Sequence, residues 1–250
     1  MVERRFEEAA MNAWPAMQVS LLDGWVLRLA GGYTKRANSV NPPYPSVDDD
    51  FADKVETCEA IYHQQQLPCI FRMTSFAAPA GLDELLDERG YHRFDHSLVL
   101  SQDLKSDSDS FSPNPHLESR EVEHWLGEYV RLSRSTMSRR DAHLAILERI
   151  PGNALFGVLA PDGSEKPVAA GLAVTEGDYI GLFDIVTDPD HRNRGHGAAL
   201  VNALLASAVA TGAKTAYLQV VSGNSAAIAL YRKLGFSEAY HYWYRIPPDR

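Results

Sequence analysis

The chain has 250 residues, of which 45% are hydrophobic, and a formal net charge of −9 at pH 7. This length is enough for two compact cores, and no apolar run approaches the ~18 residues that a membrane-spanning helix needs. The negative charge argues against broad nucleic-acid binding and is compatible with an amine or another cationic substrate.

The N-terminal residues and the cysteines bear on location and metal binding. The start, Met-Val-Glu-Arg-Arg-Phe-Glu-Glu, has no signal-peptide core, so we expect a cytoplasmic protein. Cys58 and Cys69 are too few for a disulfide framework and lack metal-ligand spacing. We therefore expect buried, inert thiols and no metal site.

In chain order, the first half alternates helical and strand-like segments. Helices are expected at residues 3–13, 51–64 and 82–91, and strands at residues 25–29, 38–40, 69–73 and 94–100. The segment 31–39 is rich in glycine and polar groups, which makes it either a candidate substrate-lining loop or an ordinary solvated turn.

A polar stretch with two prolines, residues 101–115, then indicates a flexible connector. It divides the chain into an N-terminal domain over residues 1–105, a linker over 106–115 and a C-terminal domain over 116–250.

The second half predicts a mixed α/β sheet. Strands are expected at residues 117–122, 154–159, 168–175, 179–186, 214–221 and 237–246, and helices at 123–133, 139–149 and 198–210, with a further helix before the last strand. The run Pro161-Asp162-Gly163-Ser164 is a hairpin signal between two of the strands.

The most informative segment follows the strand 179–186 and precedes the helix 198–210. It has the sequence Arg192-Asn193-Arg194-Gly195-His196-Gly197. A helix N-terminus has unpaired N–H groups and partial positive charge, so it binds anions. Glycines allow a pyrophosphate to approach the backbone, and arginines add positive charge. The segment therefore predicts a phosphate-binding loop.

The spacing of this loop excludes two common phosphate-binding motifs. A Walker loop requires Gly-Lys-Ser/Thr, and a dinucleotide-binding loop requires three glycines with an acidic residue about 20 positions later. Arg-x-x-Gly-x-Gly after a strand resembles instead the acetyl-CoA loop of the GCN5-related N-acetyltransferase (GNAT) superfamily.

A second motif lies downstream. The pattern Asn224-x-x-Ala227-x-x-Leu230-Tyr231-x-x-x-Gly235-Phe236 is similar to the second GNAT signature and occurs in the right order, after a helix and a strand. Taken alone, Asn224 is also a favoured helix N-cap, and Tyr231 shares an apolar helix face. The functional interpretation therefore depends on the two motifs together.

The resemblance implies an acyl-CoA N-acyltransferase fold for residues 116–250 and a set of site residues. Asn224 would contact the pantetheine arm, and the backbone of the strand before the loop would polarise the thioester carbonyl. The acetyl-CoA-binding residues implied are Ile185, Val186, Arg192, Asn193, Arg194, Gly195, His196, Gly197, Asn224 and Tyr231.

Two residues are candidate catalysts. The resemblance assigns Tyr231 as the acid that protonates the leaving CoA thiolate. Asp184, in the strand before the loop, is the candidate base that acts through water, and regular alternation would put it on the same face as Val186. An equally weighted alternative makes Asp184 a structural hydrogen-bond acceptor. His191 and His196 flank the loop, and His241 is a further candidate base.

The first half has the same layout as the second: a strand, a helix, a glycine followed by an aromatic residue, and a further strand. The glycine-aromatic pair is Gly90-Tyr91 in the first half and Gly235-Phe236 in the second. This indicates an internal duplication, as in tandem acetyltransferases, with a degenerate first copy. That copy has no Arg-x-x-Gly-x-Gly loop and has Leu86 where the second has Tyr231. We expect it to shape the acceptor site and not to use acetyl-CoA.

Together these features predict an acetyl-CoA-dependent N-acetyltransferase that moves the acetyl group directly to a primary amine of a small molecule or amino acid in a ternary complex. The alternatives are a protein-lysine acetyltransferase, an acyltransferase for longer acyl groups, and a non-catalytic acyl-CoA sensor. The sequence does not identify the acceptor, and we predict no nucleic-acid or membrane partner.

Overall fold

The computed structural model describes residues 2–47, 51–76, 80–104, 114, 116–161 and 164–248. They form two compact units. The first comprises the chain up to Val99, Val221–Gly223 and the chain from Ala239 on, and the second comprises Leu100–Val220 and Asn224–Glu238. This division differs from a single cut of the chain, because the C-terminal strand groups with the first unit. The predicted linker, 106–115, lies outside the described residues except for Asn114.

The first unit is a mixed sheet with helices. Its elements are α1 (Val2–Ala13), β1 (Gln18–Leu22), β2 (Trp25–Leu29), η1 (Lys35–Ala37), β3 (Val40–Asn41), α2 (Phe51–Gln64), β4 (Phe71–Thr74), α3 (Leu82–Glu88), β5 (His92–Asp103) and most of β11 (Ser237–Ile246). The strands follow the order β1-β2-β3-β4-β11-β5. β3 and β4 pair in parallel, and β11 pairs antiparallel with β4.

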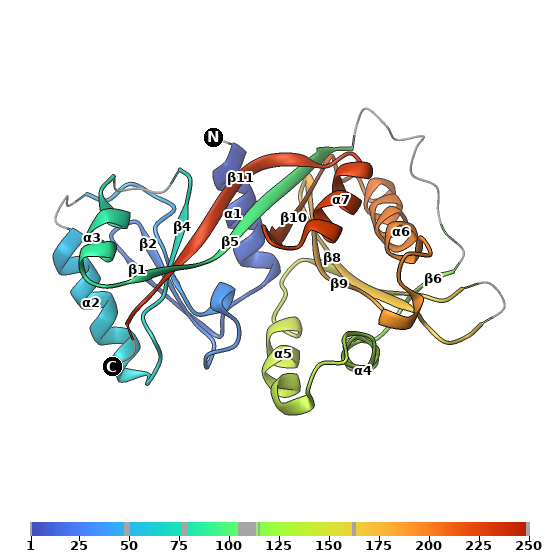
Figure 1. The fold of residues 1–250 in the computed structure, drawn as a ribbon, viewed down its shortest axis with the longest axis horizontal. Helices are drawn as coiled ribbons and strands as arrows, with labels where there is room; N and C mark the ends of the chain where they lie inside the picture. Colours follow the sequence, from blue (N-terminus) through green and yellow to red (C-terminus); the bar gives the residue numbers. More distant parts are fainter. Residues whose placement is uncertain are drawn as a thin grey trace. The chain divides into compact units, whose positions relative to one another are not determined.

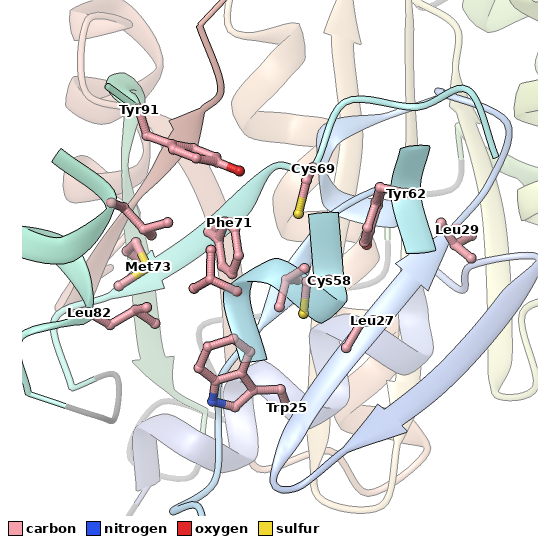
Figure 2. Close-up of a cluster of buried hydrophobic side chains, with 13 residues drawn as sticks. Trp25, Leu27, Leu29, Cys58, Tyr62, Cys69, Phe71, Met73, Leu82 and Tyr91 are labelled. Carbon is pink, nitrogen blue, oxygen red and sulfur yellow. The ribbon is translucent and has the colours of Figure 1, made fainter. Parts of the chain in front are cut away.

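Strand alternation divides the side chains of this unit between two faces. On one face, residues of β2 and β4 such as Trp25 and Phe71 pack against α2 and α3, as Figure 2 shows. On the other face, Arg28 Nη2 donates to the Met11 carbonyl of α1 at 3.0 Å. Arg72 pairs with Glu7 of the same helix. The first unit therefore has an apolar core on one side of its sheet and a buried charged network on the other.

The second unit is built on the order β5-β10-β9-β8-β7-β6. Its elements are β6 (Leu117–Ser119), α4 (Val122–Ser133), η3 (Met137–Arg139), α5 (Arg140–Leu147), β7 (Asn153–Leu159), β8 (Ala169–Glu176), β9 (Tyr179–Thr187), η4 (Pro189–His191), α6 (His196–Ala210), β10 (Thr215–Val221) and α7 (Ser225–Lys233). β9 and β10 pair in parallel, whereas β6, β7, β8 and β9 pair antiparallel in sequence.

Helices cover both faces of this second sheet. α4 and α6 both pack on β8 and β9, with α4 on one side of these strands and α6 on the other (Figure 1). The close packing of α6 depends on a glycine: a Cβ built on Gly171 of β8 would lie 3.2 Å from side-chain carbons of Leu200 and Leu204. The core thus fixes where α6 begins, and its first turn forms part of the site described below.

Most of the predicted elements are present, but one strand was not predicted and other elements begin or end at different residues. β1 was not predicted; it is an exposed edge strand whose five residues all pair with β2. β5 continues through residues 101–103, so the polar stretch that predicted a connector begins as strand. α6 begins at His196, two residues before the predicted start. Two residues of the predicted hairpin turn, 162 and 163, lie outside the described residues.

The segment 31–39 is held together by its own hydrogen bonds. Asn38 Oδ1 accepts from the amides of Ala30 and Gly32, at 2.7 and 2.9 Å, and Asn38 Nδ2 donates to the Thr34 carbonyl. Asn38 and Ser39 are buried. The geometry is that of an ordered turn, and the role of this segment as a substrate-lining loop stays a prediction.

Among the described helices, none has the length and apolar character needed to span a bilayer. The cytoplasmic location stays a prediction from the sequence.

Candidate functional site

The first turn of α6 presents backbone N–H groups that no side chain caps. Gly195 is the N-cap residue, with φ +85°, and makes no side-chain capping bond. The first intrahelical bond runs from the Ala199 amide to the Gly195 carbonyl at 2.9 Å. The preceding amides therefore lack an acceptor within the helix, which is the arrangement that binds anions.

The loop before α6 is shaped by local hydrogen bonds. Asp188 accepts from the Asp190 amide at 3.1 Å, and this bond lowers the pKa of the Asp188 carboxyl. Arg192 Nε donates to the Thr187 carbonyl at 3.4 Å. Asn193 has φ +59°, a left-handed conformation that asparagine tolerates. These contacts turn the chain from the end of β9 into the N-terminus of α6.

This loop borders a cavity of about 410 Å³ in the second unit. The structure brings together there nearly all the predicted acetyl-CoA-binding residues, which come from β9, the loop, α6 and α7: Ile185, Val186, Arg192, Asn193, Gly195, His196, Gly197, Asn224 and Tyr231. Arg194 is the exception, because its exposed side chain does not line the cavity. Further lining residues that were not predicted as site residues are Thr187, His191, Ala198, Ala226, Ala227 and Leu230.

Asp184 lies at a bulge of β9 and is not among the residues that line this cavity. Ala170 pairs with Val186 but Leu172 pairs with Phe183, so two residues of β9 oppose one of β8. Asp184 adopts φ +49° at the bulge. Val186 lines the cavity next to this bulge, whereas Asp184 does not. The role of Asp184 as the base stays a prediction.

The Asp184 carboxylate is paired with a histidine that sequence analysis missed. Its Oδ2 lies 2.8 Å from Nε2 of His143 on α5, and the two side chains are only 12% and 5% exposed. The His143 ring also makes an edge contact with Tyr129 of α4, with centroids 5.4 Å apart. The two residues are 41 positions apart, and no local spacing signals such a contact. The pair ties α5 to the bulge of β9.

Tyr231 is a largely buried phenol at the cavity wall. It is 8% exposed, and its ring makes an edge contact with Phe236, with centroids 6.0 Å apart. Burial raises the pKa of Tyr231 to about 12. The hydroxyl is therefore protonated at neutral pH and is available as a proton donor.

Asn224 lines the cavity and also caps α7. Its Oδ1 accepts from the Ala227 amide at 3.2 Å. The carbonyl oxygen of the side chain is thus engaged by the helix, and the amide nitrogen is the group that can donate to a ligand. The two sequence-based roles of Asn224, as a cap and as a ligand contact, are compatible.

The chemistry of the cavity fits a diphosphate-containing ligand. Uncapped amides and Arg192 supply positive charge, and no Asp or Glu is among the described residues that line it. Within the same described part of the chain, no group of three or more His, Cys, Asp and Glu residues is arranged to hold a metal ion.

Comparisons with known proteins agree with this geometry. A family model described as "Probable histone acetyltransferase Rv0428c C-terminal" matches residues 3–245. The chain is also similar to the "Uncharacterized N-acetyltransferase YobR" of Bacillus subtilis (strain 168), with 31% identity over 249 residues that cover 97% of this chain and 98% of that relative.

Two solved structures share the fold over both units. A GCN5-related N-acetyltransferase from Kribbella flavida has a TM-score of 0.72 at 18% identity, covering 99% of this chain and 96% of that one. A tandem GNAT protein from the clavulanic acid biosynthesis pathway has a TM-score of 0.64 at 13% identity, covering 97% and 88%. The likeness confirms the predicted mixed α/β fold and its GNAT-like extension through the first half.

Proposed function

The chain belongs to the family described as "Probable histone acetyltransferase Rv0428c C-terminal" and, with it, to the GNAT superfamily, and from this premise we propose how its second unit transfers an acetyl group. It is a GNAT-type N-acetyltransferase, and the family implies acetyl-CoA as its co-substrate. The observation that carries the proposal is the uncapped N-terminus of α6, which lies beside a cavity lined by residues of both sequence motifs.

In the proposed complex, the amides of the first turn of α6 and the Arg192 side chain bind the pyrophosphate of acetyl-CoA. The Asn224 amide nitrogen donates to the pantetheine arm. Ile185 and Val186 line the cavity next to the bulge, and their backbone orients and polarises the thioester carbonyl. Their location on β9 supports this assignment.

The proposed reaction is direct transfer in a ternary complex. The amine lone pair attacks the thioester carbon, a C–N bond forms, and the C–S bond breaks. The nitrogen releases a proton to water as the amide forms. The CoA thiolate takes a proton from the Tyr231 hydroxyl, which is supported by the cavity position of Tyr231 and by its protonated state. A proton from water later restores the Tyr231 hydroxyl. The attacking ammonium must first lose a proton, which at a pKa near 10 costs roughly 4 kcal/mol at pH 7.

The prediction that Asp184 is the base that removes this proton has less support than its structural alternative. Its carboxylate is engaged by His143 and does not line the cavity. We infer that the pair holds the β9 bulge, and through it the Ile185 and Val186 backbone. The proton then leaves through water or another group.

The proposed acceptor is a primary amine of a small molecule or amino acid. A protein amine is the second candidate, because the matching family is described as a probable histone acetyltransferase. A thiol-release screen against amines, amino acids, aminoglycosides and lysine peptides separates the two. Tight acetyl-CoA binding without thiol release for any amine would instead indicate an acyl-CoA sensor. Tighter binding of thioesters with longer acyl chains would indicate an acyltransferase for larger acyl groups.

A pair of glycine variants tests the cofactor site. Gly195 and Gly212 stand at opposite ends of α6, with φ +85° and +96°, and no atom lies within 4 Å of a Cβ built on either. Only Gly195 lines the cavity. The backbone strain of Gly195→Trp and Gly212→Trp is therefore similar, but only the first indole occupies the proposed pyrophosphate site.

We expect Gly195→Trp to weaken acetyl-CoA binding by about a hundredfold or more, ~2.8 kcal/mol at 1.4 kcal/mol per factor of ten. Gly212→Trp should leave the affinity unchanged. Isothermal titration of both variants measures the difference. Equal affinities would contradict the placement of the pyrophosphate.

A further inference from the structure

A second cavity lies within the first unit, at the C-terminal end of α2. Its volume is about 390 Å³, which is within the range of small-molecule sites. Its apolar walls come from two segments, the loop after α2 and the end of β11 with the chain that follows it, through Leu67, Pro68, Ile246, Pro247 and Pro248. Three prolines among these residues make the walls stiff before any ligand arrives.

This cavity is not a second copy of the acetyl-CoA site. It has no glycine loop and no uncapped helix N-terminus, and no Lys or Arg is among the described residues that line it. A pyrophosphate would therefore find no lysine or arginine side chain to bind it there. Its ligand must therefore differ in chemistry from acetyl-CoA.

The polar end of the cavity is formed by Cys69, Tyr91 and the carboxylate of Glu59. Figure 2 shows the Tyr91 hydroxyl directed toward Cys69. The Tyr91 hydroxyl donates to Glu59 Oε1 at 2.8 Å. Burial raises the pKa of both Cys69 and Tyr91, so both stay protonated. The hydrogen-bond acceptor that these residues present to the cavity is thus the Glu59 carboxylate.

Glu59 has no partner of opposite charge in the described part of the chain. Its hydrogen bond comes from a neutral phenol, and no described Lys, Arg or His side chain forms an ion pair with it. Glu56, one turn earlier on α2, is by contrast paired with Arg89 at 3.0 Å. A carboxylate beside apolar walls favours a cation that also brings hydrogen-bond donors.

From this arrangement we propose that the cavity binds a small apolar amine, with its ammonium on Glu59 and its hydrocarbon body against the proline-lined walls. The site belongs to the first unit and is independent of acetyl transfer. It gives the unit that lacks the acetyl-CoA loop a ligand of its own.

Binding of 2-phenylethylamine and of its neutral isostere 2-phenylethanol to the full chain tests the proposal. By isothermal titration at pH 7, the amine should bind at least about tenfold more tightly than the alcohol. Glu59→Gln removes the charge and keeps the shape, so it should weaken amine binding by about tenfold or more and leave alcohol binding unchanged.

The matched control is Glu56→Gln, on the same helix and already paired, which should leave amine binding unchanged. Unchanged binding of the alcohol shows that the cavity of each variant is intact, and titration with acetyl-CoA reads the second unit separately, since neither residue lines that site. Equal binding of amine and alcohol, equal binding to wild type and Glu59→Gln, or no amine binding at about 10 mM would each overturn the proposal. Because acetyl-CoA binding is read separately, these outcomes do not depend on the proposed function.

Discussion

The two units share a turn but not a site. In the first, α3 ends at Gly90, with φ +82°, and the Tyr91 amide donates to the Leu86 carbonyl at 2.8 Å. In the second, α7 ends at Gly235, with φ +95°, and the Phe236 amide donates to the Tyr231 carbonyl at 3.0 Å. The backbone pattern is the same helix C-cap in both.

The side chains at this shared turn differ in their surroundings. Leu86 is fully buried in the apolar core, whereas Tyr231 lines the cavity of the second unit. The first unit has the same backbone turn, but it packs a leucine into its core at the position where the second unit has the proposed proton donor, Tyr231. The comparison teaches that the backbone turns identify such a repeat, whereas a few side chains placed on those turns determine whether it is active.

The largest expected effect is at the active position of the second unit. Tyr231→Phe removes the proposed proton donor, so turnover should fall by about 10²–10⁴-fold with acetyl-CoA affinity changed less than about threefold. Thiol release with an acceptor from the screen gives turnover, and isothermal titration gives affinity. Tyr62→Phe is the control, because it also removes a buried hydroxyl but in the first unit. An unchanged turnover number for Tyr231→Phe would remove the acid role.

The second prediction concerns the buried charges of the first unit. Arg72→Met leaves the Glu7 carboxylate buried without its cation, so the free energy of unfolding should fall by about 3–5 kcal/mol. The double variant Glu7→Gln with Arg72→Met should recover part of this loss. Urea denaturation measures both.

The exposed pair Lys214–Asp178 provides a control for this prediction, and Lys214→Met should change the stability by less than about 1 kcal/mol. If Arg72→Met proves no more destabilising than Lys214→Met, the network in the first unit does not stabilise the fold as inferred.

A third prediction separates the two roles of Asp184. His143→Leu leaves that carboxylate without its partner and should cost about 1–3 kcal/mol of stability, together with a loss of turnover. His143→Gln keeps a nitrogen donor and should restore much of both. Denaturation and thiol-release assays measure the two quantities. Asp184→Asn with wild-type stability and no turnover would show instead that Asp184 is a base.

The smallest effect tests the shared turn itself. Gly90→Ala and Gly235→Ala should each cost about 1–2 kcal/mol, because both glycines have positive φ. Gly235→Ala should cost slightly more, since its Cβ would lie 2.9 Å from the Gln102 side-chain nitrogen, whereas a Cβ on Gly90 lies 3.7 Å from Pro248. Thermal denaturation compares them. A negligible loss of stability at only one of the two positions would show that the two turns are not equivalent.

The loop that we propose binds acetyl-CoA and the helix that carries Tyr231 could be predicted because their signals are local. Glycine and arginine at fixed spacing before a helix, and Asn224 seven residues before Tyr231, specify a backbone shape within one or two turns of chain. The cavity of the second unit contains nearly all of these residues for that reason.

Only the tertiary structure decided the surroundings of Asp184 and the grouping of the last strand. The His143–Asp184 contact joins α5 to a bulge in β9, and β11 pairs with β4 of the first unit. Both contacts depend on which distant segments of the chain meet, and the contact of Asp184 also depends on one extra residue in β9. Neither is encoded in spacing or alternation, because a bulge shifts the register and strand pairing is settled by long-range packing.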